Sequence, residues 1–105
     1  MALAPLTPEQ RADALAKAAL ARKARGDVKT ELKRGAVTLA EVLKSAESSD
    51  IVGKMKVSAL LGAMPGVGKV RARQIMERHG IAEGRRLRGL GAKQRAALEL
   101  EFAGA

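Results

Sequence analysis

The chain has 105 residues, of which 20 are Lys or Arg and 11 are Asp or Glu, so its formal net charge is +9. This length suits one domain with an extension rather than two independent cores, and the charge favours a polyanionic partner. The absence of cysteine excludes disulfides, thiol redox chemistry and zinc–thiolate sites. Phe102 is the only aromatic residue, so the core must be built from small and aliphatic side chains.

The sequence gives no sign of a membrane partner. No apolar run approaches the roughly 18–20 residues that a membrane span needs. The first five residues lack the charged start and the apolar core of a signal peptide. We therefore expect a cytoplasmic protein, which in an organism without a nucleus lies beside the chromosome. A monomer is expected in solution.

One long helix is predicted over residues 8–34, after a short irregular lead over residues 1–6. Residues 7–10 read Thr-Pro-Glu-Gln, in which threonine and glutamine can form a capping box and proline suits the first helical position. Gly26 interrupts a run of strong helix formers at a cost of about 1 kcal/mol relative to alanine, and we expect a continuous or slightly bent helix there. Gly35 ends it.

This helix has few large apolar residues, and its first half can bury little. It is therefore expected to project from the rest of the molecule. Its large apolar residues are Leu15, Leu20, Val28 and Leu32.

Four short helices are predicted in the remaining chain, over residues 39–46, 56–63, 68–79 and 92–102. Thr38 and Glu41 form a second capping box at the first of these. A polar break at residues 48–50 and a basic loop at residues 81–91 separate them. Apolar residues recur at helical spacing and no alternation with a period of two is present, so no sheet is expected. The residues expected to face inward are Leu39, Val42, Leu43, Val57, Leu60, Leu61, Met64, Ala72, Ile75, Met76, Leu98 and Phe102.

The turn between the second and third of these helices has the composition of a phosphate-binding hairpin. Gly66 and Gly68 permit positive φ and leave no side chain in the way of a close approach. The second glycine stands where the next helix begins, so free amides and the helix dipole favour an anion there. Val67 is expected to fill the junction beneath, and Lys69 and Arg71 add positive charge. The alternative interpretation is an ordinary helix–helix turn.

Positive charge is concentrated in residues 54–95, which hold eleven Lys or Arg and only two acids. Within this block, Arg85, Arg86 and Arg88 precede Gly89-Leu90-Gly91, which again places an apolar residue between two glycines before a predicted helix. Such arginines can contact phosphates or enter a narrow minor groove. A solvated basic loop is the alternative.

Residues 60–75 resemble the helix-hairpin-helix and helix-two-turns-helix group of DNA-binding motifs, with the pattern Leu60-Leu61-x-x-Met64-Pro65-Gly66-Val67-Gly68-x-x-x-Ala72-x-x-Ile75. Residues 52–61 and 85–91 narrow the resemblance to the actinobacterial, mycobacterial-type, integration host factor family. It covers essentially the whole chain, including the helix start at residues 7–10. The hairpin leucine typical of the wider motif is Met64 here, a change that should preserve packing.

The resemblance implies an all-α fold, with a long N-terminal helix in residues 1–34 and a compact helix-two-turns-helix domain in residues 35–105. It implies a nucleoid-associated protein that binds double-stranded DNA with little sequence specificity, bends and compacts it, and takes part in phage integration and gene regulation. No cofactor or metal is implied. The family's DNA-binding positions map onto Pro65–Arg71 and onto Arg85, Arg86 and Arg88. With the neighbouring cations and glycines, the expected DNA-binding residues are Lys54, Lys56, Pro65, Gly66, Val67, Gly68, Lys69, Arg71, Arg73, Arg85, Arg86, Arg88, Gly89, Gly91 and Lys93.

Catalysis is not expected, although the same hairpin occurs in DNA glycosylases. No aspartate follows Asp50, and no aromatic residue is placed to stack on a flipped base. His79, the only histidine, lies on the apolar face of its predicted helix and is expected to pack there or to act as a cation at the helix C-terminus. Glu99 and Glu101 are two residues apart, on different faces of a helix, and form no metal pair.

Two binding alternatives stay open. A ribosomal small-subunit-like protein would share the basicity, the glycine turn and the long helix, and RNA would then be the partner. Its usual long basic tail is absent here, since the chain ends in residues 99–105 with two glutamates and no cation. A protein-interaction helix bundle is the third interpretation, and it predicts no affinity for DNA.

Overall fold

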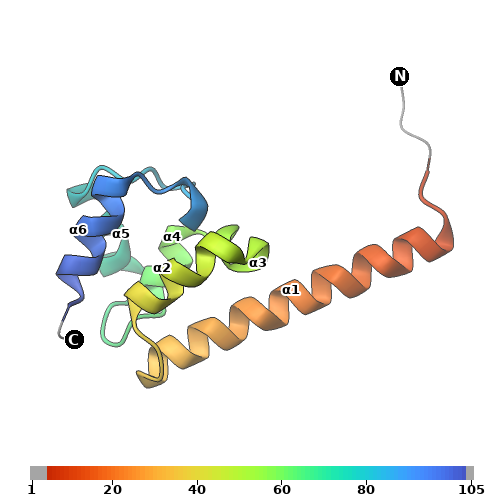
Figure 1. The fold of residues 1–105 in the computed structure, drawn as a ribbon, viewed down its shortest axis with the longest axis horizontal. Helices are drawn as coiled ribbons and strands as arrows, with labels where there is room; N and C mark the ends of the chain where they lie inside the picture. The colour runs from red at the N-terminus through yellow and green to blue at the C-terminus, as the bar shows by residue number, and fades with distance from the viewer. Residues whose placement is uncertain (1–4, 104–105) are drawn as a thin grey trace.

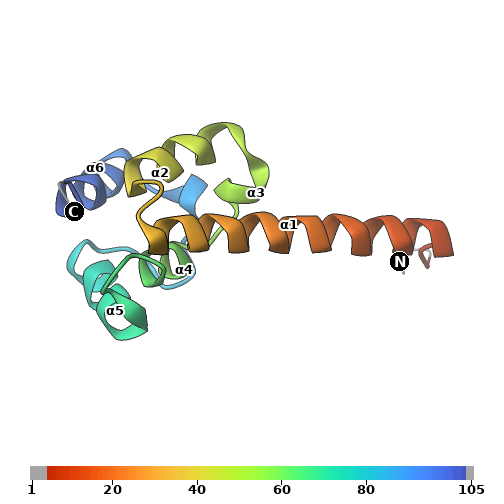
Figure 2. The same ribbon diagram turned by 90° about the horizontal axis from the view of Figure 1, so that it is seen from below.

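The computed structural model describes residues 5–103, which form one long helix and a body of short helices (Figures 1 and 2). The all-α prediction is confirmed: the described residues contain no strand, only one isolated antiparallel bridge between Lys56 and Arg86. Residues 1–4 of the predicted irregular lead lie outside the described part. The elements are α1 (Pro8–Arg34), α2 (Leu39–Ser48), α3 (Asp50–Gly53), α4 (Val57–Gly62), α5 (Gly68–Arg78), the 3-10 helix η1 (Leu87–Gly89) and α6 (Ala92–Glu101).

Helix α1 has the predicted bounds and runs without interruption through Gly26. Thr7 accepts a hydrogen bond from the Gln10 amide at 3.1 Å, and the Gln10 side chain accepts one from the Thr7 amide at 3.0 Å. Gly35 closes the helix in a left-handed conformation. Leu32 is the only buried residue of α1, so most of the helix extends away from the body, as Figure 2 shows.

The chain between α2 and α4 is more helical than predicted. α2 begins after its Thr38 cap as expected and continues two residues further, to Ser48. The predicted break at residues 48–50 is reduced to Ser49, which ends α2 and caps the unpredicted helix α3 by accepting a hydrogen bond from the Val52 amide at 3.3 Å. The body therefore has five α-helices and a 3-10 turn rather than about four helices.

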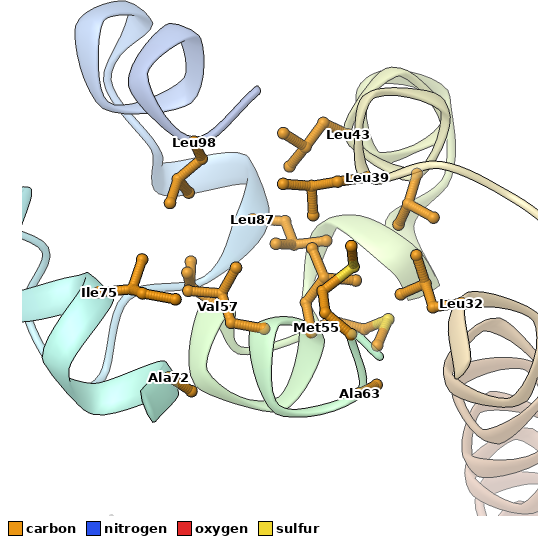
Figure 3. Close-up of a cluster of buried hydrophobic side chains, with 14 of the residues drawn as sticks. Leu32, Leu39, Leu43, Met55, Val57, Ala63, Ala72, Ile75, Leu87 and Leu98 are labelled. Carbon is orange, nitrogen blue, oxygen red and sulfur yellow. The ribbon is translucent and has the colours of Figure 1, made fainter. Parts of the chain in front are cut away.

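The core gathers one or more side chains from every helix of the body and from the last turns of α1. Figure 3 shows Leu32 of α1, Leu98 of α6 and Leu87 of η1 converging on side chains of α2 and α4. Val57, Leu60, Leu61 and Leu98 have no exposed surface. All the predicted inward-facing residues are buried except Phe102, which is half-buried and packs on the edge of the cluster.

Two glycines of the body provide a matched test of this packing. A Cβ on Gly53 would lie 3.0 Å from the Ala46 carbonyl oxygen and 3.4 Å from Arg88 Cβ, whereas a Cβ on Gly62 would have nothing within 4 Å. Gly53→Ala is therefore expected to lower the free energy of unfolding by about 1–3 kcal/mol, because the neighbouring backbone must shift.

Gly62→Ala is the control, and it should leave stability unchanged or raise it by up to about 1 kcal/mol. Thermal unfolding followed by circular dichroism measures both, with about 4–8 °C expected per kcal/mol in a domain of this size. Equal melting temperatures for the two variants would contradict this account of Gly53.

No helix within residues 5–103 is both long and apolar enough to cross a membrane.

Candidate nucleic-acid interface

The turn between α4 and α5 is built on two left-handed glycines. Gly66 has a φ of 75° and Gly68 a φ of 70°, values that cost a residue with a Cβ about 1–2 kcal/mol. A Cβ at either position would have nothing within 4 Å, so this side of the turn is open to an approaching group. Val67, between them, is half-buried and packs against the core, as the sequence predicted.

The first turn of α5 presents backbone amides and positive charge together. Its N-cap, Val67, offers no side-chain hydrogen bond, so no side chain occupies the position where an anion would accept from the first amides. Lys69 and Arg71 are exposed in this turn, and Pro65 is exposed just before it. The arrangement can hold a phosphate through the backbone, the helix dipole and two cations.

The predicted basic loop at residues 81–91 is partly ordered by pairing with the chain before α4. The Leu87 amide donates to the Met55 carbonyl oxygen at 2.9 Å, and the Val57 amide donates to the Arg85 carbonyl oxygen at 2.9 Å. Leu87 is buried beneath. The arginine segment is therefore held against the body by backbone hydrogen bonds and an apolar anchor rather than being a loose loop.

Each arginine of this segment has an internal partner. Arg85 Nη1 donates to the Gly89 carbonyl oxygen at 2.8 Å, and Arg86 Nη1 donates to the Lys54 carbonyl oxygen at 2.5 Å. Arg88 lies 3.8 Å from Asp50 in an exposed ion pair. All three side chains remain exposed, so their positions are fixed while donor groups stay available to a ligand.

The second glycine turn is not a copy of the first. Gly89 and Gly91 do not have positive φ; Gly91 is an extended N-cap of α6. The deeply buried residue is Leu87, whereas Leu90, expected between the glycines as the apolar anchor, is only half-buried. Gly89 serves a different purpose, because a Cβ there would lie 3.2 Å from Arg85 Cδ. It gives the Arg85 side chain room to fold back.

A basic groove runs between α1 and the body. Its volume is about 350 Å³, and six of its nine lining residues are Lys or Arg, with no acid among them. Lys54, Lys56 and Arg86 were expected in a binding site, but the cations that α1 contributes were not. The cations of this groove, called the basic groove below, are Arg22, Arg25, Lys29, Lys54, Lys56 and Arg86.

The sequence does carry a signal for the cations of α1. Arg22, Arg25 and Lys29 are spaced i, i+3 and i+7, which places them on one face of a helix. That spacing does not reveal what the face lies against. Its role in a binding groove is evident only from the fold, which brings this face beside residues 54–56.

The remaining predicted cations are more scattered. Arg73, one turn along α5 from Lys69, lies 3.7 Å from Glu83 in an exposed ion pair. Lys93 is exposed in the first turn of α6. The structure thus gathers Lys54, Lys56 and Arg86 in one groove and places Lys69, Arg71 and Arg73 along α5.

The other charged residues near the C-terminus hold the body together. His79 Nε2 lies 2.5 Å from Glu101 Oε2, and Arg78 pairs with the same carboxylate. Arg95 contacts Glu99 at 3.0 Å and Glu47 of α2 at 3.2 Å. The hydrogen bond that Arg95 donates to Glu99 raises the pKa of Arg95 from its usual value. Glu101 therefore links α6 to the end of α5, and Glu47 links α2 to α6, whereas Glu99 pairs with Arg95 within α6. No group of three potential metal ligands is found among the described residues.

Comparison with known proteins relates this geometry to other chains. The family described as S13-like H2TH domain matches residues 32–102. An integration host factor from Streptomyces coelicolor is 64% identical over 102 residues, which cover 97% of this chain and 95% of the relative. An integration host factor from Mycobacterium tuberculosis is 60% identical over 105 residues, the full length of both chains. The chain belongs to the actinobacterial integration host factor family.

A solved structure extends the likeness to three dimensions. The chain in the structure of sIHF bound to an 8-bp palindromic DNA is 60% identical, with a TM-score of 0.82 over 83% of this chain and 98% of that chain. The integration host factor resemblance predicted from the hairpin and residues 85–91 is therefore confirmed.

Proposed function

We propose that this protein is a non-catalytic, nucleoid-associated protein that binds double-stranded DNA mainly through its phosphates. The observation that carries the proposal is the pairing of an open, uncapped glycine hairpin with a separate acid-free basic groove. Both surfaces suit a phosphate backbone, and the similar sIHF chain is bound to DNA. Contacts of this kind hold the duplex and carry no sequence information.

The hairpin and the basic groove are the two parts of the proposed contact surface. The Gly66 and Gly68 amides, with Lys69 and Arg71, hold one run of phosphates. Arg85, Arg86 and Arg88, with the basic groove, hold a second run on the same duplex or on another. A monomer with two such surfaces can bend one duplex or bridge two, which compacts DNA and supports phage integration and gene regulation. Sequence preference then comes from how easily the DNA deforms.

RNA is the second candidate partner, because the matching family is described as S13-like. A comparison of duplex DNA with a structured RNA of equal length, by fluorescence anisotropy across a salt series, separates the two. We expect the duplex to bind more tightly at every salt concentration. Its affinity should fall about a thousandfold or more between about 50 mM and about 200 mM salt if six or more phosphates are contacted.

Tighter binding to the RNA at matched salt would overturn the DNA proposal. Binding to neither nucleic acid would favour the third interpretation, a protein-interaction bundle.

A further inference from the structure

One further cavity among the described residues is not explained by binding to a phosphate backbone alone. It lies between the last turns of α1, the exposed face of α4, and α5, and has a volume of about 890 Å³. This size is within the range of small-molecule sites. We call it the α1–α5 cavity.

The charges around this cavity are mixed, unlike those of the basic groove. Residues 54–95 contain only two acids, Glu77 and Glu83, and both line the α1–α5 cavity. Glu83 is 3.7 Å from Arg73, whereas Glu77 has no ion-pair partner among residues 5–103. A carboxylate here repels a DNA phosphate but accepts hydrogen bonds from N–H groups.

Cations and an apolar floor complete the cavity. Lys29 and Lys33 are one turn apart on α1 and face it from one side, and Lys69 of α5 is also in its wall. Met76 and Ile81 are almost fully buried side chains that contribute to its floor. The lining therefore combines cations, apolar residues and a carboxylate that has no ion-pair partner among residues 5–103.

We propose that the α1–α5 cavity binds a purine nucleotide. The base lies on the apolar floor and donates its ring and amino N–H groups to Glu77, while Lys29 and Lys33 hold the phosphate. A carboxylate accepts two parallel N–H bonds from a guanine edge, so a guanine nucleotide satisfies the site best. Pyrimidine nucleotides have less flat area to place on the floor.

The ligand would share residues with the DNA site, since Lys29 of the basic groove and Lys69 and Arg73 of the proposed DNA-binding set also line the α1–α5 cavity. An occupied cavity adds negative charge beside the hairpin, which lowers the affinity for phosphate. This coupling rests on the proposed function, but binding of the nucleotide itself does not.

Isothermal titration calorimetry of the full chain without DNA tests the site. GMP is the probe, and IMP, which lacks the 2-amino group, and ribose 5-phosphate, which lacks the base, are the comparison ligands. We expect GMP to bind about tenfold more tightly than IMP, as the loss of one charge-assisted hydrogen bond predicts. Ribose 5-phosphate should bind more weakly than both. Equal binding of all three would show a phosphate site only and would overturn the proposal.

Three variants locate the ligand. Gly62→Leu fills the α1–α5 cavity, since a Cβ on Gly62 would have nothing within 4 Å and this residue lines the cavity, and it should weaken GMP binding more than tenfold. Glu77→Gln should remove most of the preference for GMP over IMP. Glu31→Gln is the control, because it makes an equal charge change on an exposed residue of α1 outside this cavity. It should change neither the affinity for GMP nor the preference for GMP over IMP.

Thermal melting and DNA binding of Gly62→Leu, a residue outside the proposed DNA site, verify that the variant is folded. If Gly62→Leu is folded and binds GMP as the parent does, the α1–α5 cavity is not the site. Unchanged GMP–IMP preference in Glu77→Gln would contradict the role of that carboxylate. DNA binding that persists while GMP fails to bind would overturn this inference and leave the proposed function standing.

Discussion

Replacing Arg85, Arg86 and Arg88 by alanine is expected to lower the affinity for duplex DNA about 100-fold. If each residue loses one phosphate contact worth about 1 kcal/mol, the sum of about 3 kcal/mol corresponds to that factor. The slope of log affinity against log salt should become shallower by about 2–3, because each neutralised phosphate contributes about 0.9. The loss should be similar on unrelated sequences, since phosphates carry no sequence information.

The internal hydrogen bonds of these arginines make a folding control necessary. Arg85 and Arg86 donate to carbonyl oxygens of Gly89 and Lys54, so a loosened segment would also lower the affinity. Melting curves show whether the alanine variant has lost stability, and so whether a loosened segment contributes to the loss of affinity. The matched variant replaces all three by lysine, which keeps the charge and should keep the salt slope while losing the fixed guanidinium geometry.

The cations that α1 contributes to the basic groove can be tested by the same measurements. Alanine at Arg22, Arg25 and Lys29 should also lower affinity, because these residues lie beside Arg86 in one groove. If both groups of residues contact the same phosphates, the loss of affinity in the combined variant should differ from the sum of the two separate losses. The combined variant joins these substitutions to the alanine replacements of Arg85, Arg86 and Arg88. Unchanged affinity and unchanged salt slope in the Arg85–Arg88 variant would exclude this segment from the DNA site.

Replacing Gly66 and Gly68 by alanine is expected to weaken DNA binding about tenfold and to destabilise the fold. Each alanine must adopt a φ of 70–75°, which costs about 1–2 kcal/mol. The added methyl groups also point into open space, where the phosphate would approach the backbone amides. Weaker hydrogen bonding between these amides and the phosphate should cost about 1.4 kcal/mol, the equivalent of that tenfold factor.

Gly80→Ala separates the backbone strain from the effect on the phosphate. Gly80 has a φ of 65° and equally open surroundings, but it follows α5 instead of preceding it. The melting temperature of Gly80→Ala should fall by about as much as that of Gly66→Ala or Gly68→Ala alone. Its DNA affinity should stay at the parental level. Anisotropy titrations and melting curves on the same samples measure both quantities. If the hairpin variants bind DNA as tightly as Gly80→Ala, the Gly66–Gly68 amides do not contact the phosphate.

Local features of the sequence were sufficient for the helices with strong end signals. The Thr7 and Thr38 capping boxes set the starts of α1 and α2, and Gly35 set the end of α1, because these signals act through hydrogen bonds within a few residues. The same holds for the hairpin, where glycine is needed at φ values that other residues adopt at a cost. The inward face of each predicted helix followed from its spacing.

Features that depend on distant neighbours could not be predicted from the sequence. Helix α3 has only four residues, too few to form alone, and its buried Val52 and Gly53 are held by the packed body. The 3-10 turn η1 forms where residues 85–87 pair with residues 55–57, a pairing across about thirty residues of chain. No local pattern in either segment indicates that pairing.

The sequence by itself determined the helical class, the long N-terminal helix, the open hairpin and the positive charge of residues 54–95. These follow from local backbone preferences, helical periodicity and a count of charges, none of which requires a partner elsewhere in the chain. Only the tertiary structure decided which charges share a surface. It placed Arg22, Arg25 and Lys29 beside Lys54 and Arg86, and set Glu77 into the mixed-charge α1–α5 cavity, because the end of α1 packs on the body through Leu32, which is buried in the common core, and Val28, which packs against it.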